Sequence, residues 1–118
     1  MVGIDIIKID RIEKFIKKFG KKGLQRFLSE NEIEISKNNM KRVAGFWAVK
    51  EAISKSLKVG IGREFSFHDV EITKNSKGTP IANLSEKIIE NFSVADISIS
   101  ITHDGDYAVA VAIVEIQK

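Results

Sequence analysis

Two carboxylates occur in segments of the chain that are otherwise largely apolar. Asp5 lies in Val-Gly-Ile-Asp-Ile-Ile (residues 2–7), and Glu51 lies in Phe-Trp-Ala-Val-Lys-Glu-Ala-Ile-Ser-Lys (residues 46–55). Burial of an ionised carboxylate is costly unless a cation meets it. Lys55 follows Glu51 by four residues and shares its face of a helix. The sequence therefore indicates a cationic partner for both acids, and a divalent ion is the simplest candidate.

Composition narrows the kind of metal and the kind of protein. The chain has 118 residues, no Cys and two His, so disulfides, thiol nucleophiles and thiolate metal sites are excluded. Any metal is then expected to be hard and bound through oxygen. The length predicts a single domain over residues 1–118 with a core of its own. Because we find neither a membrane span nor a signal peptide, we expect a soluble, cytoplasmic protein with no membrane partner.

The hydrophobic pattern predicts an α+β fold with a small antiparallel sheet and a long central helix. Asp10 is expected to cap the first helix, and Gly20 is expected to end it. The sequence predicts a C-terminal hairpin with His103 at its tip. Two segments in which apolar residues alternate along the chain flank the turn signal Asp104-Gly105. Strands are expected at 2–9, 65–73, 97–102 and 107–116, and helices at 11–19, 41–58 and 84–92, with a short capped helix after Ser29.

Positive charge is concentrated in one segment. Residues 10–22 contain six bases and two acids, whereas the remainder of the chain has 13 bases and 14 acids. On an amphipathic helix these bases form the exposed side, which by default is only a solvated face. Their excess over acids indicates instead a docking surface for an acidic partner. The bases are Arg11, Lys14, Lys17, Lys18, Lys21 and Lys22.

Three segments together resemble the holo-acyl-carrier-protein synthases, the small 4′-phosphopantetheinyl transferases. Gly-Ile-Asp-Ile at residues 3–6 is similar to the family's Gly-x-Asp-(Ile/Leu/Val) signature. Residues 46–55, followed by Gly-Ile-Gly at 60–62, are similar to its Phe-x-x-Lys-Glu-Ala-x-x-Lys helix and glycine loop. Ser-Ile-Ser-Ile-Thr-His at 98–103, followed by Tyr-Ala at 107–108, is similar to the family's closing hairpin. The resemblance covers nearly the whole chain, in order and at family spacing.

The resemblance implies transfer of 4′-phosphopantetheine from coenzyme A to a serine of apo acyl carrier protein in fatty acid biosynthesis, with release of 3′,5′-ADP. It also implies Mg²⁺, held by Asp5 and Glu51, and a homotrimer with active sites between subunits. Lys55 is implied as a third catalytic residue that meets a phosphate of the leaving group. The serine proton would leave to a metal-bound water or to one of the carboxylates. The basic segment at 10–22 would bind the acidic carrier protein.

The same resemblance assigns a set of residues to coenzyme A. His103 matches a family position near the 3′-phosphate, and the two glycines would let backbone approach the nucleotide. Two residues depart from the family: Phe46 stands where many members have Arg, and Asp104 replaces Ser or Thr. Both changes remove positive character, so the sequence predicts weak discrimination against 3′-dephospho-coenzyme A. The expected coenzyme A contacts are Lys50, Ser54, Lys55, Gly60, Gly62, His103 and Asp104.

Two other functions compete with the transferase. A nucleic-acid-binding domain without enzymatic activity would use the basic helix for phosphate contacts, but the rest of the chain is net acidic, so no nucleic-acid partner is expected. A structural subunit with a degenerate site is the second alternative, and the changes at Phe46 and Asp104 keep it under consideration. Modification of an apo carrier protein in the presence of coenzyme A and Mg²⁺ would separate these functions.

Overall fold

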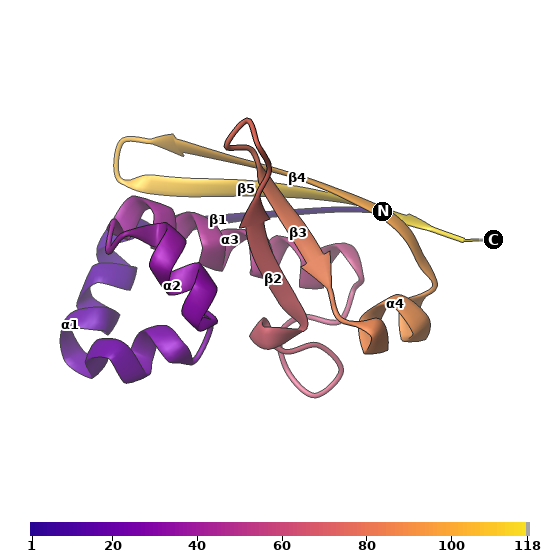
Figure 1. The fold of residues 1–118 in the computed structure, drawn as a ribbon, viewed down its shortest axis with the longest axis horizontal. Coiled ribbons are helices and arrows are strands. Elements are labelled where there is room, and N and C mark those ends of the chain that lie inside the picture. Colours follow the sequence, from indigo (N-terminus) through magenta and orange to yellow (C-terminus); the bar gives the residue numbers. More distant parts are fainter. Residues whose placement is uncertain (118) are drawn as a thin grey trace.

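The computed structural model describes residues 1–117, which form two antiparallel sheets and four α-helices (Figure 1). In chain order the elements are β1 (Val2–Lys8), α1 (Ile9–Gln25), α2 (Glu30–Ser36), α3 (Met40–Ser56), a 3₁₀ turn (Phe67–Asp69), β2 (Val70–Lys74), β3 (Pro80–Leu84), α4 (Glu86–Phe92), β4 (Val94–Asp104) and β5 (Tyr107–Ile116). The α+β class and the long central helix predicted from the sequence are confirmed.

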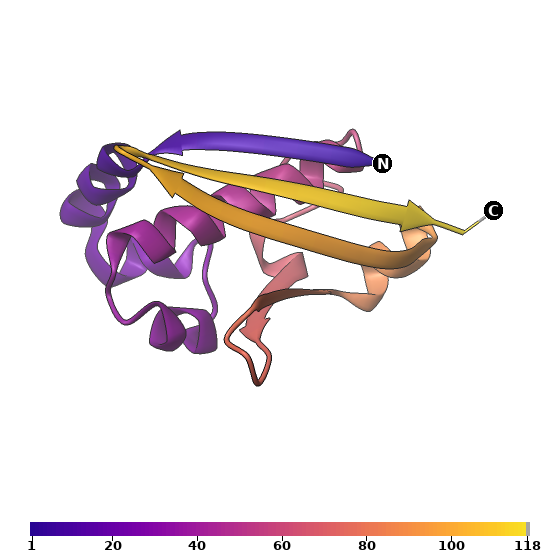
Figure 2. The same cartoon turned by 90° about the horizontal axis from the view of Figure 1, so that it is seen from above.

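The larger sheet has the order β1-β5-β4, and β2 pairs with β3 in a separate two-stranded sheet. The helices lie on one side of the larger sheet, and in the described part of the chain no helix covers its other side (Figure 2). No helix of this part is long and apolar enough to cross a bilayer.

The central helix α3 packs closely against the inner face of the larger sheet. Ala108, Ala110 and Ala112 of β5 are fully buried there, because only small side chains leave room for a helix so near the strand. At the edge of the sheet Gly3 meets the backbone of α3: a Cβ atom at this position would lie 1.9 Å from the carbonyl oxygen of Ala52. The missing side chain of Gly3 therefore sets how closely β1 approaches α3.

The first helix begins earlier than the sequence predicts. It begins at Ile9, with Lys8 at the N-cap position and no side-chain capping hydrogen bond, whereas Asp10 lies in its first turn, so the predicted cap is wrong. The chain enters the helix directly from β1 because Ile9 is buried and its N–H donates to the carbonyl of Asp106 at 2.8 Å. The predicted stop is confirmed: Gly20 has a non-helical backbone with a φ of 62°, and a second helical segment follows it to Gln25.

Two further segments differ from the prediction. The strand expected at 65–73 begins only at Val70 and continues to Lys74, because Ser66 and Asp69 form a capping box around a 3₁₀ turn at Phe67–Asp69. The predicted hairpin is present, but its turn is formed by Gly105 and Asp106. His103 lies just inside β4, opposite Ala108.

Candidate active site

The carboxylate of Asp5 lies on the inner face of β1, at the edge of the sheet beside the second half of α3. Its side chain is only 12% exposed, and its Oδ1 accepts a hydrogen bond from Lys55 Nζ at 2.7 Å. The Lys55 side chain is 51% exposed and extends over the backbone of Ile4, whose carbonyl lies 3.4 Å from the same Nζ. The structure therefore brings together two of the three residues expected to be catalytic.

Glu51 is the third member of this group. It lies one helical turn before Lys55 on α3 and is partly buried. Burial raises the pKa of the Glu51 carboxyl above its ordinary value, and the neighbouring Asp5 carboxylate raises it further, whereas Lys55 lowers it. Two carboxylates that disfavour each other's charge form an acidic pair that a further cation would stabilise. The expected proximity of Asp5, Glu51 and Lys55 is confirmed; their roles stay predictions.

This pair does not constitute a complete metal cage. Among the residues that the structure describes, no group of three or more His, Cys, Asp or Glu side chains is arranged to hold a metal ion. Two carboxylates nevertheless match the needs of Mg²⁺, which takes one or two protein carboxylates and fills its other positions with water and substrate phosphate. Asp5 and Glu51 therefore fit Mg²⁺ better than a metal that requires an all-protein site.

Two residues expected to bind coenzyme A are in the core, and this part of the prediction is wrong. The side chain of Lys50 has no exposed surface, and its Nζ donates to the carbonyl of Phe27 at 2.7 Å and to Glu32 Oε1 at 2.8 Å. Ser54 is likewise fully buried, and its hydroxyl donates to the carbonyl of Glu51. Because neither side chain reaches the surface, neither can contact a bound ligand directly.

The partner of Lys50 was missed by sequence reasoning. Glu32 was expected only as part of a capping box with Ser29, and that box is present. Its carboxylate has a second role, because Oε1 receives Lys50 and Oε2 accepts the N–H of Ile72 at 2.8 Å. Burial lowers the pKa of Lys50, while Glu32 raises it. One buried ion pair therefore joins α2, α3 and β2.

The remaining residues expected at coenzyme A lie at the surface. Gly60, with a φ of 68°, and Gly62 belong to the loop after α3, and a Cβ atom at either position would meet no heavy atom within 4 Å. His103 Nε2 lies 2.8 Å from the carbonyl of Lys41, while Asp104 is exposed at the end of β4. His103 and Asp104 are thus at the far end of α3 from Lys55. Their ligand contacts stay predictions.

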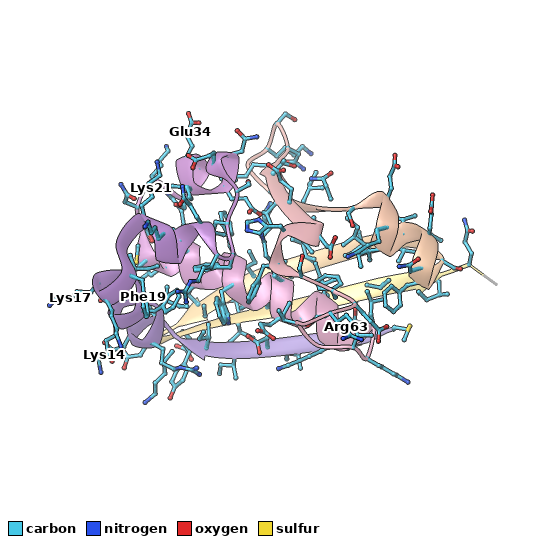
Figure 3. All side chains as sticks on the ribbon, turned by 90° about the horizontal axis from the view of Figure 1, so that it is seen from below. Lys14, Lys17, Phe19, Lys21, Glu34 and Arg63 are labelled. Atoms are coloured by element: carbon cyan, nitrogen blue, oxygen red, sulfur yellow. The ribbon has the colours of Figure 1, made fainter. Side chains whose placement is uncertain are left out.

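The basic residues of 10–22 are all exposed on α1. Lys14 and Lys17 project from the outer side of this helix, away from the sheet (Figure 3). Lys14 pairs with Asp10 at 3.0 Å, and Lys21 lies 3.8 Å from Glu30. Phe19 is 39% exposed between them. The segment therefore forms a basic surface with an aromatic residue, which we call the α1 surface.

Comparison with known proteins places this geometry in a family. Residues 1–112 match the family model described as the 4′-phosphopantetheinyl transferase superfamily. The chain is 56% identical over 115 residues to a holo-(acyl-carrier-protein) synthase of Sulfurimonas denitrificans, covering 98% of this chain and 94% of that protein. The chain therefore belongs to the 4′-phosphopantetheinyl transferase superfamily, a family of enzymes.

Solved structures agree with this assignment. A crystal structure of Helicobacter pylori holo-(acyl-carrier-protein) synthase in complex with coenzyme A is 48% identical, with a TM-score of 0.95 over 98% of this chain and 100% of that one. A Bacillus anthracis holo-(acyl-carrier-protein) synthase is 37% identical, with a TM-score of 0.82 over 98% and 96% of the two chains. Within the superfamily, this chain is therefore similar to the holo-acyl-carrier-protein synthases, and the family, fold and enzyme class expected from the sequence are confirmed.

Proposed function

We propose that this chain transfers 4′-phosphopantetheine from coenzyme A to a serine of an apo acyl carrier protein of fatty acid biosynthesis in the cytoplasm. The observation that carries the proposal is the meeting of Asp5, Glu51 and Lys55 between β1 and α3, in a chain of this superfamily. The serine oxygen forms a bond to the β-phosphorus, and the bond from that phosphorus to the bridging oxygen breaks. The leaving group is 3′,5′-ADP, and the serine proton passes to a carboxylate or to water.

Asp5 and Glu51 are the residues that would hold Mg²⁺. When bound there, the ion would neutralise pyrophosphate charge and orient the phosphorus for in-line displacement. Lys55 Nζ already lies 2.7 Å from Asp5 and has half of its side chain exposed, so it can turn toward a phosphate oxygen beside the carboxylates. A cation at that place stabilises the charge that develops on the leaving group.

The α1 surface is the proposed docking site for the carrier protein. All six of its bases are exposed, and ion pairs within the described chain involve only Lys14 and Lys21. Phe19 adds apolar area, with Lys18 Nζ 5.3 Å and Arg26 Cζ 4.8 Å from the centre of its ring. Uncompensated positive charge around an exposed aromatic residue suits an acidic partner, because charge guides the encounter and the ring contributes buried contact.

The uncovered face of the larger sheet supports a homotrimer. Val2, Ile4 and Ile6 of β1 are 66%, 59% and 61% exposed, and Ile113 of β5 is 49% exposed. The register places Ile4 opposite Val111 and Ile6 opposite Val109, so these side chains form one continuous apolar surface. Figure 2 shows that the described helices leave this surface open. An apolar surface of this kind is typical of a subunit interface, and we infer that copies of this chain cover it.

Mass spectrometry of an apo carrier protein, incubated with this chain, coenzyme A and Mg²⁺, tests the function directly. A gain of one phosphopantetheine is expected with the unmodified chain. Asp5→Asn and Glu51→Gln should each lower kcat/KM by about a hundredfold or more while circular dichroism stays unchanged, because each removes a metal-binding charge without changing shape. Added Mg²⁺ should partly restore the weaker variant.

Glu34→Gln is the matched control, since Glu34 is an exposed acid on α2, away from the site (Figure 3). It should leave the rate unchanged. Absence of the mass gain with the unmodified chain would refute the transferase. Turnover near that of the unmodified chain in a folded Asp5 or Glu51 variant would refute the metal assignment.

A further inference from the structure

The buried pair of Lys50 and Glu32 has no part in the chemistry described above, although Lys50 is adjacent to Glu51 in the sequence. Consecutive residues of a helix point about 100° apart. Glu51 therefore faces Asp5, while Lys50 faces α2 on a different side of α3. Burial of two charges is costly, and an apolar pair of similar size is often no less stable. Stability alone is thus a poor explanation for the pair.

The pair holds the backbone of the corner between α1 and α2, residues 26–29, which we call the Phe27 corner. Lys50 Nζ donates to the Phe27 carbonyl at 2.7 Å, and Glu32 Oε1 accepts the Ser29 N–H at 2.7 Å. Both backbone groups lie outside the two helices. Phe27 has no exposed surface, so the corner is set into the core. Buried hydrogen bonds to charged groups, which are stronger than neutral ones, therefore tie this corner to α3.

Aromatic contacts attach the same corner to α1 and to α3. The centre of the Phe27 ring lies 5.0 Å from that of Trp47 on α3, edge to face at 78°, and 6.3 Å from that of Phe15 on α1. The Phe15 ring is in turn 5.0 Å from that of Phe19, in the α1 surface. Aromatic pairs at these separations favour particular mutual orientations. A series of four rings therefore runs from the α1 surface to the helix that carries Glu51.

The two segments of α1 are supported in different ways. The first segment continues directly from β1, and the buried side chains of Ile9 and Ile12 anchor it in the core. The second segment follows the non-helical backbone of Gly20, carries Lys22, and leads directly into the Phe27 corner. Glycine at this position gives no stiffness to the junction. The orientation of the second segment therefore depends on the corner more than that of the first segment does.

We propose that the buried pair of Lys50 and Glu32 holds the second segment of α1, and with it the α1 surface, at a fixed place relative to Asp5 and Glu51. The inference rests on the transferase function and the docking site proposed above. The serine of a docked carrier protein must reach the phosphorus beside the carboxylates, and a misplacement of about 1 Å can cost a hundredfold in rate. Lys50 is thus a positioning residue for the carrier protein, and not for coenzyme A.

Lys50→Met combined with Glu32→Gln tests the proposal. Lys50→Met alone leaves a buried carboxylate unpaired and can unfold the chain, whereas the double variant removes both charges and keeps the net charge of the chain. We expect kcat/KM for the carrier protein, measured with saturating coenzyme A well below the melting temperature, to fall by about ten- to a hundredfold. The affinity for 3′,5′-ADP with Mg²⁺, measured by calorimetric titration, should stay unchanged, because the Phe27 corner does not contact the carboxylates.

Ile88→Ala is the matched control for stability. Ile88 is fully buried on α4, which lies at the opposite end of the molecule from α1 (Figure 1). Loss of its buried carbons leaves a cavity that lowers the melting temperature without a change in the Phe27 corner. This variant should keep kcat/KM for the carrier protein below its melting temperature. A loss as large as that of the double variant would show that stability, and not position, governs the rate, and the proposal would be refuted.

Charge reversals on α1 provide a second readout, which a merely structural role of the pair would not move. In the unmodified chain Lys14→Glu, on the first segment, and Lys22→Glu, on the second, should each lower kcat/KM for the carrier protein by up to about fivefold. In the double variant the effect of Lys22→Glu should disappear, because the second segment is no longer held toward the carrier protein, while that of Lys14→Glu should remain.

The outcomes separate the positioning role from the overall function. Transfer by the double variant at the unmodified rate, or undiminished effects of both charge reversals, would refute the positioning role alone. A loss of 3′,5′-ADP affinity as large as the loss of transfer would show a general disturbance of the site and would refute it too. Absence of transfer by the unmodified chain would refute the transferase itself.

Discussion

Replacement of Gly3 by Ala tests whether the contact between β1 and α3 positions the active site. Gly3 is two residues before Asp5, on the same inner face of the strand. A Cβ atom at this position would lie 1.9 Å from the Ala52 carbonyl oxygen and 2.6 Å from the Ser56 backbone nitrogen. Both atoms belong to helix backbone, so no side-chain rotation can relieve the overlap. The strand and the helix must instead move apart.

The size of this movement follows from the distances. The Cβ to oxygen separation must increase from 1.9 Å to at least 3.0 Å, which displaces β1 from α3 by roughly 1 Å. Overpacking of this kind costs about 1–3 kcal/mol of stability. The same displacement carries Asp5 away from Glu51 and Lys55. Because a misplacement of about 1 Å can cost a hundredfold in rate, we expect kcat/KM to fall by about two orders of magnitude.

The assay combines thermal unfolding with phosphopantetheine transfer measured well below the melting temperature of the variant. Gly62→Ala is the control, because a Cβ atom at Gly62 meets no heavy atom within 4 Å. It should leave both stability and fold unchanged. Activity and melting temperature of Gly3→Ala equal to those of the unmodified chain would show that the strand tolerates the side chain. The argument that the contact between Gly3 and α3 holds Asp5 beside Glu51 and Lys55 would then be wrong.

Two further predictions concern the buried ion pair and the α1 surface. Lys50→Met leaves the fully buried Glu32 carboxylate without its cation, so we expect chemical denaturation to show a loss of about 3–5 kcal/mol in the free energy of unfolding. Lys87→Met, at the half-exposed pair with Asp69, should cost less than about 1 kcal/mol. Equal losses in the two variants would contradict a special role for the buried pair. Lys14→Glu combined with Lys18→Glu should raise KM for the carrier protein, leave KM for coenzyme A unchanged and weaken the salt dependence of kcat/KM. Unchanged salt dependence in steady-state kinetics would place carrier docking elsewhere.

The sequence identified Asp5, Glu51 and Lys55 because their surroundings make them conspicuous. A carboxylate within an apolar strand needs a cation, and a lysine one helical turn from a glutamate shares its face. The structure adds the pairing of Lys55 with Asp5 across 50 residues of chain. Spacing along one helix could not predict that contact, because it depends on how β1 lies against α3.

Lys50 shows where the same reasoning failed. Its neighbours in the motif suggested a ligand contact, but its position on α3 points it into the core toward Glu32. Glu32 carried only a local signal, its spacing from Ser29. The long-range pair between them depends on α2 packing against α3, which no spacing in the sequence reveals. Lys50, next to Glu51 in the sequence, thus contributes to the fold, while Lys55, four residues after Glu51, remains accessible.

The two glycine contacts of α3 explain why the site residues occur where they do. Near one end of α3, Gly3 of β1 lets the strand touch the helix backbone beside Asp5; near the other, Gly45 of α3 lets the helix approach Ile101 and His103 of β4. Only glycine permits such proximity, and in each case the missing side chain is next to residues that we assign to coenzyme A or to the metal. The helix thus crosses the sheet from the β4 edge, beside His103, to the β1 edge, beside Asp5, and a missing side chain at each crossing sets how closely the sheet and the helix approach each other.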